Sequence, residues 1–192
     1  PADLAAGETL RDRRRAETER SAAVLGVHRV AWLGYHDSGM TGWEQNTLPD
    51  SFIGADVEEA ATRLAEILRT EHADVLTAYD WHGNYGHPDH IQVHRVGMRA
   101  AEMAGVRVVQ ATMNRDAMRV MAQQAKEAGA DEFDPDGPAD DGNPMGTPAA
   151  DITYAVDVTP WVLQKRESIR CHASQITDSG FFSQMPDDVF AF

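Results

Sequence analysis

Short apolar segments alternate with helical segments along this 192-residue chain, and this alternation limits the fold more than any other feature. Four segments are predicted to be β-strands: residues 28–33, 73–79, 106–112 and 151–158. Helical patterns cover residues 8–25, 56–68, 88–104, 115–128 and 160–174. Strands that alternate with helices usually form a largely parallel sheet covered by helices. We therefore expect an α/β domain whose functional loops lie at the carboxyl ends of its strands.

Several local signals support the predicted helix boundaries. Gly26 and Gly105 each follow a helical segment, where a left-handed C-cap is expected. Asp56 precedes a stripe of apolar residues and can accept a hydrogen bond from the first turn of that helix. Pro88 can open a helix at its first position, because the N–H that proline lacks would have no partner there. Residues 34–54 and 131–149 are predicted to be loops, and the second of them is strongly acidic.

Composition and charge exclude some classes of partner. The chain is 42% hydrophobic and 25% charged, and no apolar run approaches the ~20 residues that a membrane span needs. Its net charge of −14 disfavours binding to nucleic acid. Cys171 is the only cysteine, so no intramolecular disulfide can form and no thiolate cage can hold a metal. We expect a single domain over residues 1–192, in the cytoplasm, without a nucleic-acid or membrane partner.

Four of the eight histidines of the chain lie in one loop and the helix that follows it. If Pro88 opens that helix, His87 lies at its N-cap, His90 in its first turn, and His94 one turn further along the same face. One or two imidazoles can then reach a common point above the sheet. For His82 and His94, a structural or supporting role is the preferred interpretation.

This cluster of imidazoles and carboxylates is a candidate metal site. Zinc binds neutral imidazole nitrogen and carboxylate oxygen, and a catalytic zinc ion activates water and polarises the carbonyl under attack. Such a site also needs an acid for the leaving group and donors toward the oxyanion, which His87, Asp89 and Tyr85 could supply. Two simpler interpretations stay open, since a histidine at a helix start often only caps it and a His/Asp-rich loop is often a solvated surface.

The run Gly86-His87-Pro88-Asp89-His90 resembles the second signature of the LmbE/PIG-L family of zinc-dependent N-deacetylases. Other segments resemble family segments in the same order: Arg14-x-x-Glu17, Leu25-Gly26-Val27, Leu33 to Met40, Lys165-Arg166 and His172 to Gln175. The similarity covers nearly the whole chain. It is greatest to the enzymes of mycothiol metabolism, the deacetylase of the glucosaminyl-inositol precursor and the mycothiol conjugate amidase.

The resemblance implies a role for each matching residue. It makes His90 a ligand of Zn²⁺, with Fe²⁺ as the alternative metal, His87 the acid or charge stabiliser, Asp89 its tuning partner and Tyr85 an oxyanion donor. A second group of residues matches positions that hold the sugar or inositol hydroxyls or line the same pocket: Arg14, Asp37 and Met40. The implied fold is a Rossmann-like three-layer sandwich with a mostly parallel sheet. The implied substrate is a small amino sugar of the N-acetylglucosaminyl-inositol or mycothiol-conjugate type, hydrolysed at its amide.

The sequence departs from the family pattern in one large respect. Family members begin with a strand that ends in Ala-His-Pro-Asp-Asp-Glu, which supplies a His ligand, an Asp ligand and the general base, and no such run occurs here. We therefore expect that the chain lacks the first strand and extends less far than the family domain at both ends, and that this piece alone is inactive. The alternative function is a non-catalytic sugar-binding module of the same fold, and a metal-dependent phosphoesterase is a third interpretation.

Overall fold

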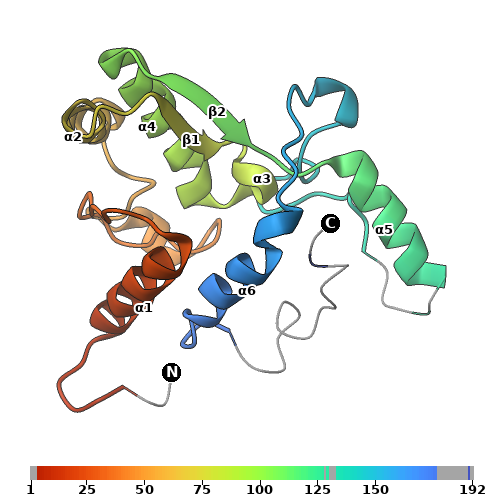
Figure 1. Cartoon of the computed structure of the whole chain (residues 1–192), viewed down its shortest axis with the longest axis horizontal. Coiled ribbons are helices and arrows are strands. Elements are labelled where there is room, and N and C mark those ends of the chain that lie inside the picture. Colours follow the sequence, from red (N-terminus) through yellow and green to blue (C-terminus); the bar gives the residue numbers. More distant parts are fainter. Residues whose placement is uncertain (1–3, 128, 130–132, 177–189, 191–192) are drawn as a thin grey trace. The chain divides into compact units, whose positions relative to one another are not determined.

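The computed structural model describes residues 4–127, 129, 133–176 and 190, and the chain divides into two units (Figure 1). The first unit combines residues 1–32 with residues 155–192, and the second is formed by residues 33–154. The regular elements are α1 (Leu10–Leu25), η1 (Glu44–Thr47), α2 (Val57–Thr70), β1 (Val75–Tyr79), α3 (Gly83–Gly86), α4 (Pro88–Ala104), β2 (Arg107–Ala111), α5 (Arg115–Glu127), η2 (Ala149–Asp151), η3 (Thr159–Trp161) and α6 (Val162–Arg170). Mixed helices and strands of this kind confirm the predicted α/β class.

Two parallel strands form the sheet of the second unit. β1 and β2 pair in a register that runs from Val75 opposite Arg107 to Tyr79 opposite Ala111. α4 is the crossover helix between them, as a parallel connection requires. Both strands therefore end at the same edge of the sheet, and the loops that begin at Asp80 and at Thr112 lie together at that edge. The two central predicted strands are thus confirmed.

Helix α4 packs between the sheet and α2, as Figure 1 shows, and this packing forms the core of the second unit. Small side chains dominate the contact between the two helices; the buried members are Ala60, Ala61, Ala65, Leu68, Val96 and Ala100. Alanines let the helix axes approach closely, since little side chain separates the two backbones. Gly97 lets α4 approach β1 as well, because a Cβ built on it would lie 3.3 Å from the Cβ of Ala78. The position of α4, and hence of its first turn, is fixed by this core.

The first unit is built around the pairing of α1 with α6. The Ser21 and Ser168 hydroxyls, both buried, lie 2.7 Å apart, and the side-chain amide of Gln164 donates a 2.7 Å hydrogen bond to the carbonyl of Val24. Glu17 is also buried, with 1% of its surface exposed. The chain beyond α6 turns back to this carboxylate, which accepts hydrogen bonds from Ser174. Polar contacts between buried groups therefore join α1 to α6 and to the turn after it.

The capping signals act as the sequence indicates. Gly26 and Gly105 end α1 and α4 in the left-handed conformation, with φ of 72° and 71°. The Asp56 side chain accepts a hydrogen bond from the Glu59 backbone at the start of α2. Pro88 is the first residue of α4, and His87 is its N-cap. These boundaries were predictable because caps depend on residues within one turn of the helix end.

Two of the four predicted strands are wrong. Residues 28–33 and 151–158 contain no strand, and none of their apolar side chains is buried, with Trp32 exposed at 47% and Val156 at 78%. A strand exists only when a neighbour completes its backbone hydrogen bonds, and no described segment pairs with either stretch. The last predicted helix is shorter than expected, because α6 ends at Arg170. The acidic segment is a loop where it is described, and its residues 131 and 132 lie outside the described part.

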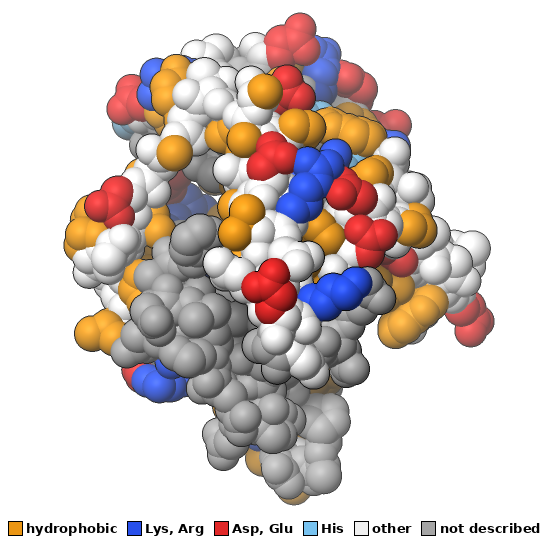
Figure 2. Space-filling view, turned by 90° about the vertical axis from the view of Figure 1, so that its right-hand side faces the viewer, with side chains coloured by type: hydrophobic (Ala, Val, Ile, Leu, Met, Phe, Trp, Pro, Cys, Tyr) orange, Lys and Arg blue, Asp and Glu red, His pale blue; other side chains and the backbone are white. Residues whose placement is uncertain are grey.

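Charged side chains of both signs share the molecular surface. On the face drawn in Figure 2, acidic and basic groups are interspersed with apolar ones, and the described residues there form no continuous basic area. No described helix combines the length and the apolar character that crossing a membrane would require.

Candidate active site at the start of helix α4

The loop between β1 and α4 is held in place by the buried carboxylate of Asp80. Its Oδ1 accepts a 2.7 Å hydrogen bond from the backbone N–H of Asn84, and its Oδ2 accepts one of 2.6 Å from the hydroxyl of Thr112. Asn84 belongs to the same loop, whereas Thr112 directly follows β2. Asp80 therefore ties together the loops that leave the two parallel strands.

Two glycines let this loop pass close to its neighbours. Gly83 has φ of +67°, and a Cβ there would lie 2.5 Å from the Cβ of His90. Gly86 has φ of +87°, and a Cβ there would lie 2.3 Å from the backbone nitrogen of Asp141. Neither position can hold a side chain without displacing a neighbour, and the positive φ values also favour glycine. The loop, labelled α3 over part of its length, is an irregular turn, since Asn84 has φ of 65° and ψ of −55°.

Three of the predicted site residues form a cluster of rings at the start of α4. The ring centroids of His87 and His90 lie 4.9 Å apart, and Tyr85 lies edge-on at 5.0 Å from His90 and 6.1 Å from His87. Tyr79, the last residue of β1, stacks on His90 with centroids 4.1 Å apart and ring planes 10° apart. The sequence prediction that imidazoles converge above the strand end is confirmed for His87 and His90.

His90 is held in a form that suits a metal ligand. Its Nδ1 lies 3.3 Å from the carbonyl oxygen of Gly83, which favours the tautomer with the hydrogen on Nδ1 and the lone pair on Nε2. Burial lowers the pKa of the imidazole, with His87 adding to the decrease, against an opposing contribution from the Gly83 hydrogen bond. The lowered pKa favours the neutral imidazole, which is the state that coordinates zinc.

His87 carries the opposite tautomer because it caps the helix. Its Nδ1 accepts a 3.1 Å hydrogen bond from the backbone N–H of Asp89, so the hydrogen of the neutral ring lies on Nε2. Asp89 in turn accepts a 3.0 Å hydrogen bond at Oδ2 from the backbone N–H of Ser38. Its Oδ1 is buried and accepts no hydrogen bond from the described residues. His87 and Asp89 are thus joined through the backbone of the first turn, and His87 presents an N–H donor.

Tyr85 is held as a protonated phenol. Burial raises its pKa above the usual 10.0, and the nearby Tyr79, Asp140 and Asp37 raise it further. A phenol with a raised pKa keeps its O–H over the whole physiological range. Tyr85 can therefore donate a hydrogen bond to a negative charge that develops beside the two histidines.

The loop with Asp37 and Met40 is fastened to the same region. The Oδ1 of Asp37 accepts a 2.8 Å hydrogen bond from the backbone of Gly39, and the neighbouring Ser38 bonds to Asp89 as described above. The backbone carbonyl of Met40 accepts a hydrogen bond of 3.2 Å from Asn46. The structure therefore brings Asp37 to the vicinity of Tyr85, whose pKa it influences. Arg14, the third predicted sugar contact, lies on α1 in the other unit.

The acidic loop contributes to the site in a way that sequence reasoning missed. The backbone N–H of Asp140 donates a 3.0 Å hydrogen bond to the carbonyl of Tyr85, and that of Gly146 donates one of 2.8 Å to the carbonyl of Asn84. The carboxylate of Asp140 also accepts a 2.9 Å hydrogen bond from the backbone of Thr41. The composition of the acidic loop indicated that it is a loop, but it did not indicate which segment the loop contacts. No local sequence pattern links residue 140 to residue 85.

The described residues do not by themselves form a three-ligand metal site. Within residues 4–127, 129, 133–176 and 190, no group of three or more His, Cys, Asp or Glu side chains is arranged to hold a metal ion. The chemistry of His90 is compatible with a zinc site, because burial favours its neutral form and its Nδ1 is hydrogen-bonded to the Gly83 carbonyl. A three-ligand site that includes His90 needs further donors.

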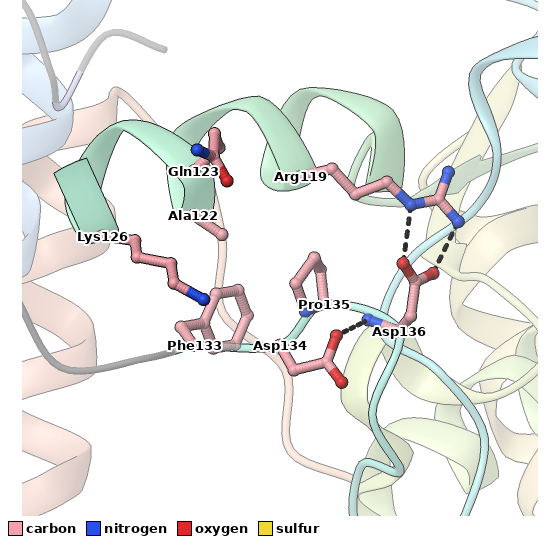
Figure 3. Close-up of a pocket in the computed structure, with 8 residues that line it drawn as sticks. All are labelled: Arg119, Ala122, Gln123, Lys126, Phe133, Asp134, Pro135 and Asp136. Carbon is pink, nitrogen blue, oxygen red and sulfur yellow. Dashed lines mark hydrogen bonds and ion pairs between the residues drawn. The ribbon is translucent and has the colours of Figure 1, made fainter.

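A pocket of about 430 Å³ lies in the second unit but away from these residues. It is bounded by α5 and the acidic loop (Figure 3), and its lining consists of Arg119, Ala122, Gln123, Lys126, Phe133, Asp134, Pro135 and Asp136. The guanidinium of Arg119 is occupied by Asp136, to which its Nε donates a 2.8 Å hydrogen bond. None of the predicted site residues lines this pocket, so we place the candidate active site at the ring cluster.

Part of the chain matches a known protein family. The sequence matches the PIG-L family, described as GlcNAc-PI de-N-acetylase, over residues 2–101. The matched region includes the positions of Arg14, Asp37, Tyr85, His87 and His90. The ring cluster and the loop of Asp37 therefore lie inside the region shared with that family.

Curated relatives bear a common name. A protein of Nocardiopsis dassonvillei named 1D-myo-inositol 2-acetamido-2-deoxy-alpha-D-glucopyranoside deacetylase is 39% identical over 94% of this chain and 69% of its own length. A protein of the same name from Streptomyces griseus subsp. griseus is 37% identical over 89% of this chain and 59% of its own length. One from Catenulispora acidiphila is 51% identical over 51% of this chain and 34% of its own length. The chain thus spans only part of the length of the relatives it resembles.

Proposed function

Because the chain belongs to the PIG-L family of de-N-acetylases, we propose that it forms part of an enzyme that hydrolyses the N-acetyl amide of an amino sugar. The substrate class is an N-acetylglucosaminyl-inositol, after the names of the relatives, or a mycothiol-type conjugate with the same amino sugar. The observation that carries this proposal is the cluster of Tyr85, His87 and His90 at the start of α4. Its members provide one neutral imidazole lone pair and two hydrogen-bond donors.

A zinc ion is the proposed cofactor, with Fe²⁺ as the alternative. His90 would hold it through Nε2, and a catalytic zinc site would need further ligands and a general base besides it. A zinc ion in such a site supplies an activated water and polarises the amide carbonyl. Two observations support this assignment: burial lowers the pKa of His90, and its Nδ1 is hydrogen-bonded to the carbonyl of Gly83.

The other residues act on the substrate itself. The Nε2–H of His87 would donate a hydrogen bond to the amide oxygen as negative charge develops on it. To hand a proton to the leaving amine instead, His87 would first have to take up a proton at Nδ1 and give up its hydrogen bond from Asp89. Tyr85 donates its phenol hydrogen to the developing oxyanion, which its raised pKa supports. Asp89 fixes the orientation of His87 through the backbone contact of the first turn.

We also propose a recognition role for the loop that follows residue 36. Asp37 would accept hydrogen bonds from sugar or inositol hydroxyls. Met40 would line the substrate pocket beside Asp37. Arg14 is proposed as a further contact to the substrate. The complete domain is proposed to be a three-layer, Rossmann-like sandwich in which the parallel pair of β1 and β2 continues into further strands. With a single cysteine, the chain suits a reducing cytoplasm.

An assay on the full-length protein tests this proposal. The protein is loaded with zinc, and release of acetate from an N-acetylglucosaminyl-inositol is measured beside amide cleavage of a mycothiol conjugate. We expect turnover of at least one of them. Binding of the sugar without turnover of either amide, with stoichiometric zinc present, would instead support a non-catalytic sugar-binding module. Turnover confined to a phosphoester would refute the amide hydrolase.

A further inference from the structure

We propose that His82 is a positioning residue that holds the acidic loop against the Tyr85 segment and so fixes the site geometry. The proposal rests on the proposed function for its kinetic consequence, but its structural part stands on the contacts described below. The sequence favours a structural or supporting role for His82, and the structure shows which groups lie beside its ring.

The His82 side chain is buried between two carboxylates of different loops. Only 1% of its surface is exposed, and both ring nitrogens are buried without a hydrogen-bond partner among the described residues. Its Nδ1 lies 3.7 Å from Oδ2 of Asp141, and its Nε2 lies 3.9 Å from Oδ2 of Asp80. An imidazole always carries at least one N–H, and a buried donor needs an acceptor. The neighbouring carboxylates can meet this need after a movement of less than ~1 Å.

Each of these carboxylates organises its own loop. Asp80 bonds to Asn84 and Thr112 at the strand ends, as described above. Asp141 accepts hydrogen bonds from Asn143, of 3.1 Å from the backbone N–H and 2.9 Å from the side-chain amide. His82 therefore lies between an anchor of the β1–α4 loop and an anchor of the acidic loop.

A displacement of Asp141 would reach the ring cluster directly. Its backbone nitrogen packs so closely on Gly86 that a Cβ there would lie at 2.3 Å. The preceding peptide donates the 3.0 Å hydrogen bond from Asp140 to the carbonyl of Tyr85. The backbone carbonyl of His82 accepts a 2.9 Å hydrogen bond from Gly86, whereas its ring packs on Trp81 and faces the two carboxylates. We therefore infer that the effect of the ring passes through the acidic loop to Tyr85.

Amide hydrogen exchange tests the structural step without any activity. In the full-length protein, the amides of Asp140 and Gly146 report the two bonds between the acidic loop and the Tyr85 segment. His82→Phe keeps a ring of similar size but removes both nitrogens, and we expect it to raise the exchange rates of these amides at least 10-fold. Unchanged exchange would overturn the proposal, whatever the enzyme does. His28→Phe, at an exposed histidine, is the matched control that leaves these rates unaltered.

Kinetics on the zinc-loaded protein test the consequence. We expect His82→Phe to lower kcat at least 10-fold with zinc content unchanged and KM within about 3-fold, and His82→Gln, which keeps a donor, to restore most of the rate. If His82 only fills space between the loops, kcat should be unaltered in His82→Phe. That outcome would refute the positioning role. Since His82 acts through Asp141, adding Asp141→Asn to His82→Phe should cause little further loss, whereas full additivity of the two effects contradicts the proposal.

Two further outcomes are distinguishable. If His82→Phe does not fold, Asp141→Asn alone takes its place, with the same expected rise in exchange at Asp140, and unchanged exchange there overturns the proposal. If the wild-type protein has no amidase activity, the proposed function fails, while the exchange experiment still decides whether His82 holds the acidic loop.

Discussion

The backbone N–H of Ser38 donates a 3.0 Å hydrogen bond to Oδ2 of Asp89, across 51 residues of sequence. Ser38 is fully buried, so water cannot replace this bond. It follows Asp37, a proposed sugar contact, whereas Asp89 lies between the two histidines of the ring cluster. The bond therefore sets the position of the recognition loop relative to the first turn of α4.

Replacement of Asp89 should show how much the Ser38–Asp89 hydrogen bond contributes to the free energy of unfolding. Asp89→Ala leaves the buried N–H of Ser38 without an acceptor, and we expect a loss of roughly 1 to 3 kcal/mol in the free energy of unfolding. Asp89→Asn keeps an acceptor oxygen and should lose less than half as much. Urea unfolding of both variants measures the difference, and equal losses would contradict this account of the bond.

Substitution of each histidine of the cluster should affect a different property, zinc binding for one and the catalytic rate for the other. In the full-length protein, His90→Ala removes the proposed ligand, so zinc content should fall, whereas His87→Ala should keep zinc and lose about 10²- to 10⁴-fold in kcat. Elemental analysis and steady-state kinetics measure the two effects, with His94→Ala as a control on the same helix. Stoichiometric zinc in His90→Ala would show that the ligand is assigned wrongly.

Glu17 should make the free energy of unfolding of the protein depend on pH. Burial by itself raises the pKa of this carboxyl, but the 2.8 Å and 2.6 Å hydrogen bonds from Ser174 outweigh it and leave the pKa below the ordinary 4.5. A depressed folded-state pKa contributes stability that is present above the unfolded-state pKa and is lost as pH falls through the folded-state value. Glu17→Gln should therefore be clearly less stable than wild type at pH 7, by an amount that shrinks below about pH 4.5. Urea midpoints at several pH values check this, and a constant difference would contradict it.

Gly86 and Gly142 have similar backbone angles, so a comparison of the two separates the steric contact at Gly86 from the cost of a positive φ. Gly86 and Gly142 have φ of +87° and +82°, but a Cβ meets Asp141 in the first case and nothing within 4 Å in the second. Alanine at either position carries the cost of positive φ, roughly 1 kcal/mol, whereas Gly86→Ala must also displace the acidic loop. We expect Gly86→Ala to lower the unfolding midpoint and kcat further than Gly142→Ala, and matching losses in the two variants would refute the close contact.

Much of the local structure could be predicted because it depends on neighbours in sequence. Pro88 begins α4, His87 caps it and His90 lies in its first turn, as their spacing indicated. The two central strands and the glycine caps were likewise confirmed. The predicted strands at residues 28–33 and 151–158 were wrong, since an apolar pattern cannot supply the neighbouring strand that completes its hydrogen bonds.

The sequence by itself determined how His87, Asp89 and His90 are spaced, because one helical turn and its cap fix that geometry. It also indicated which residues are candidates for the chemistry. Only the tertiary structure decided that Asp140 supports Tyr85, that Ser38 meets Asp89 and that His82 is buried between two carboxylates. These contacts join residues far apart in the chain through irregular loops. Their positions follow from the packing of α4 against α2 and the sheet, and no periodicity in the sequence encodes them.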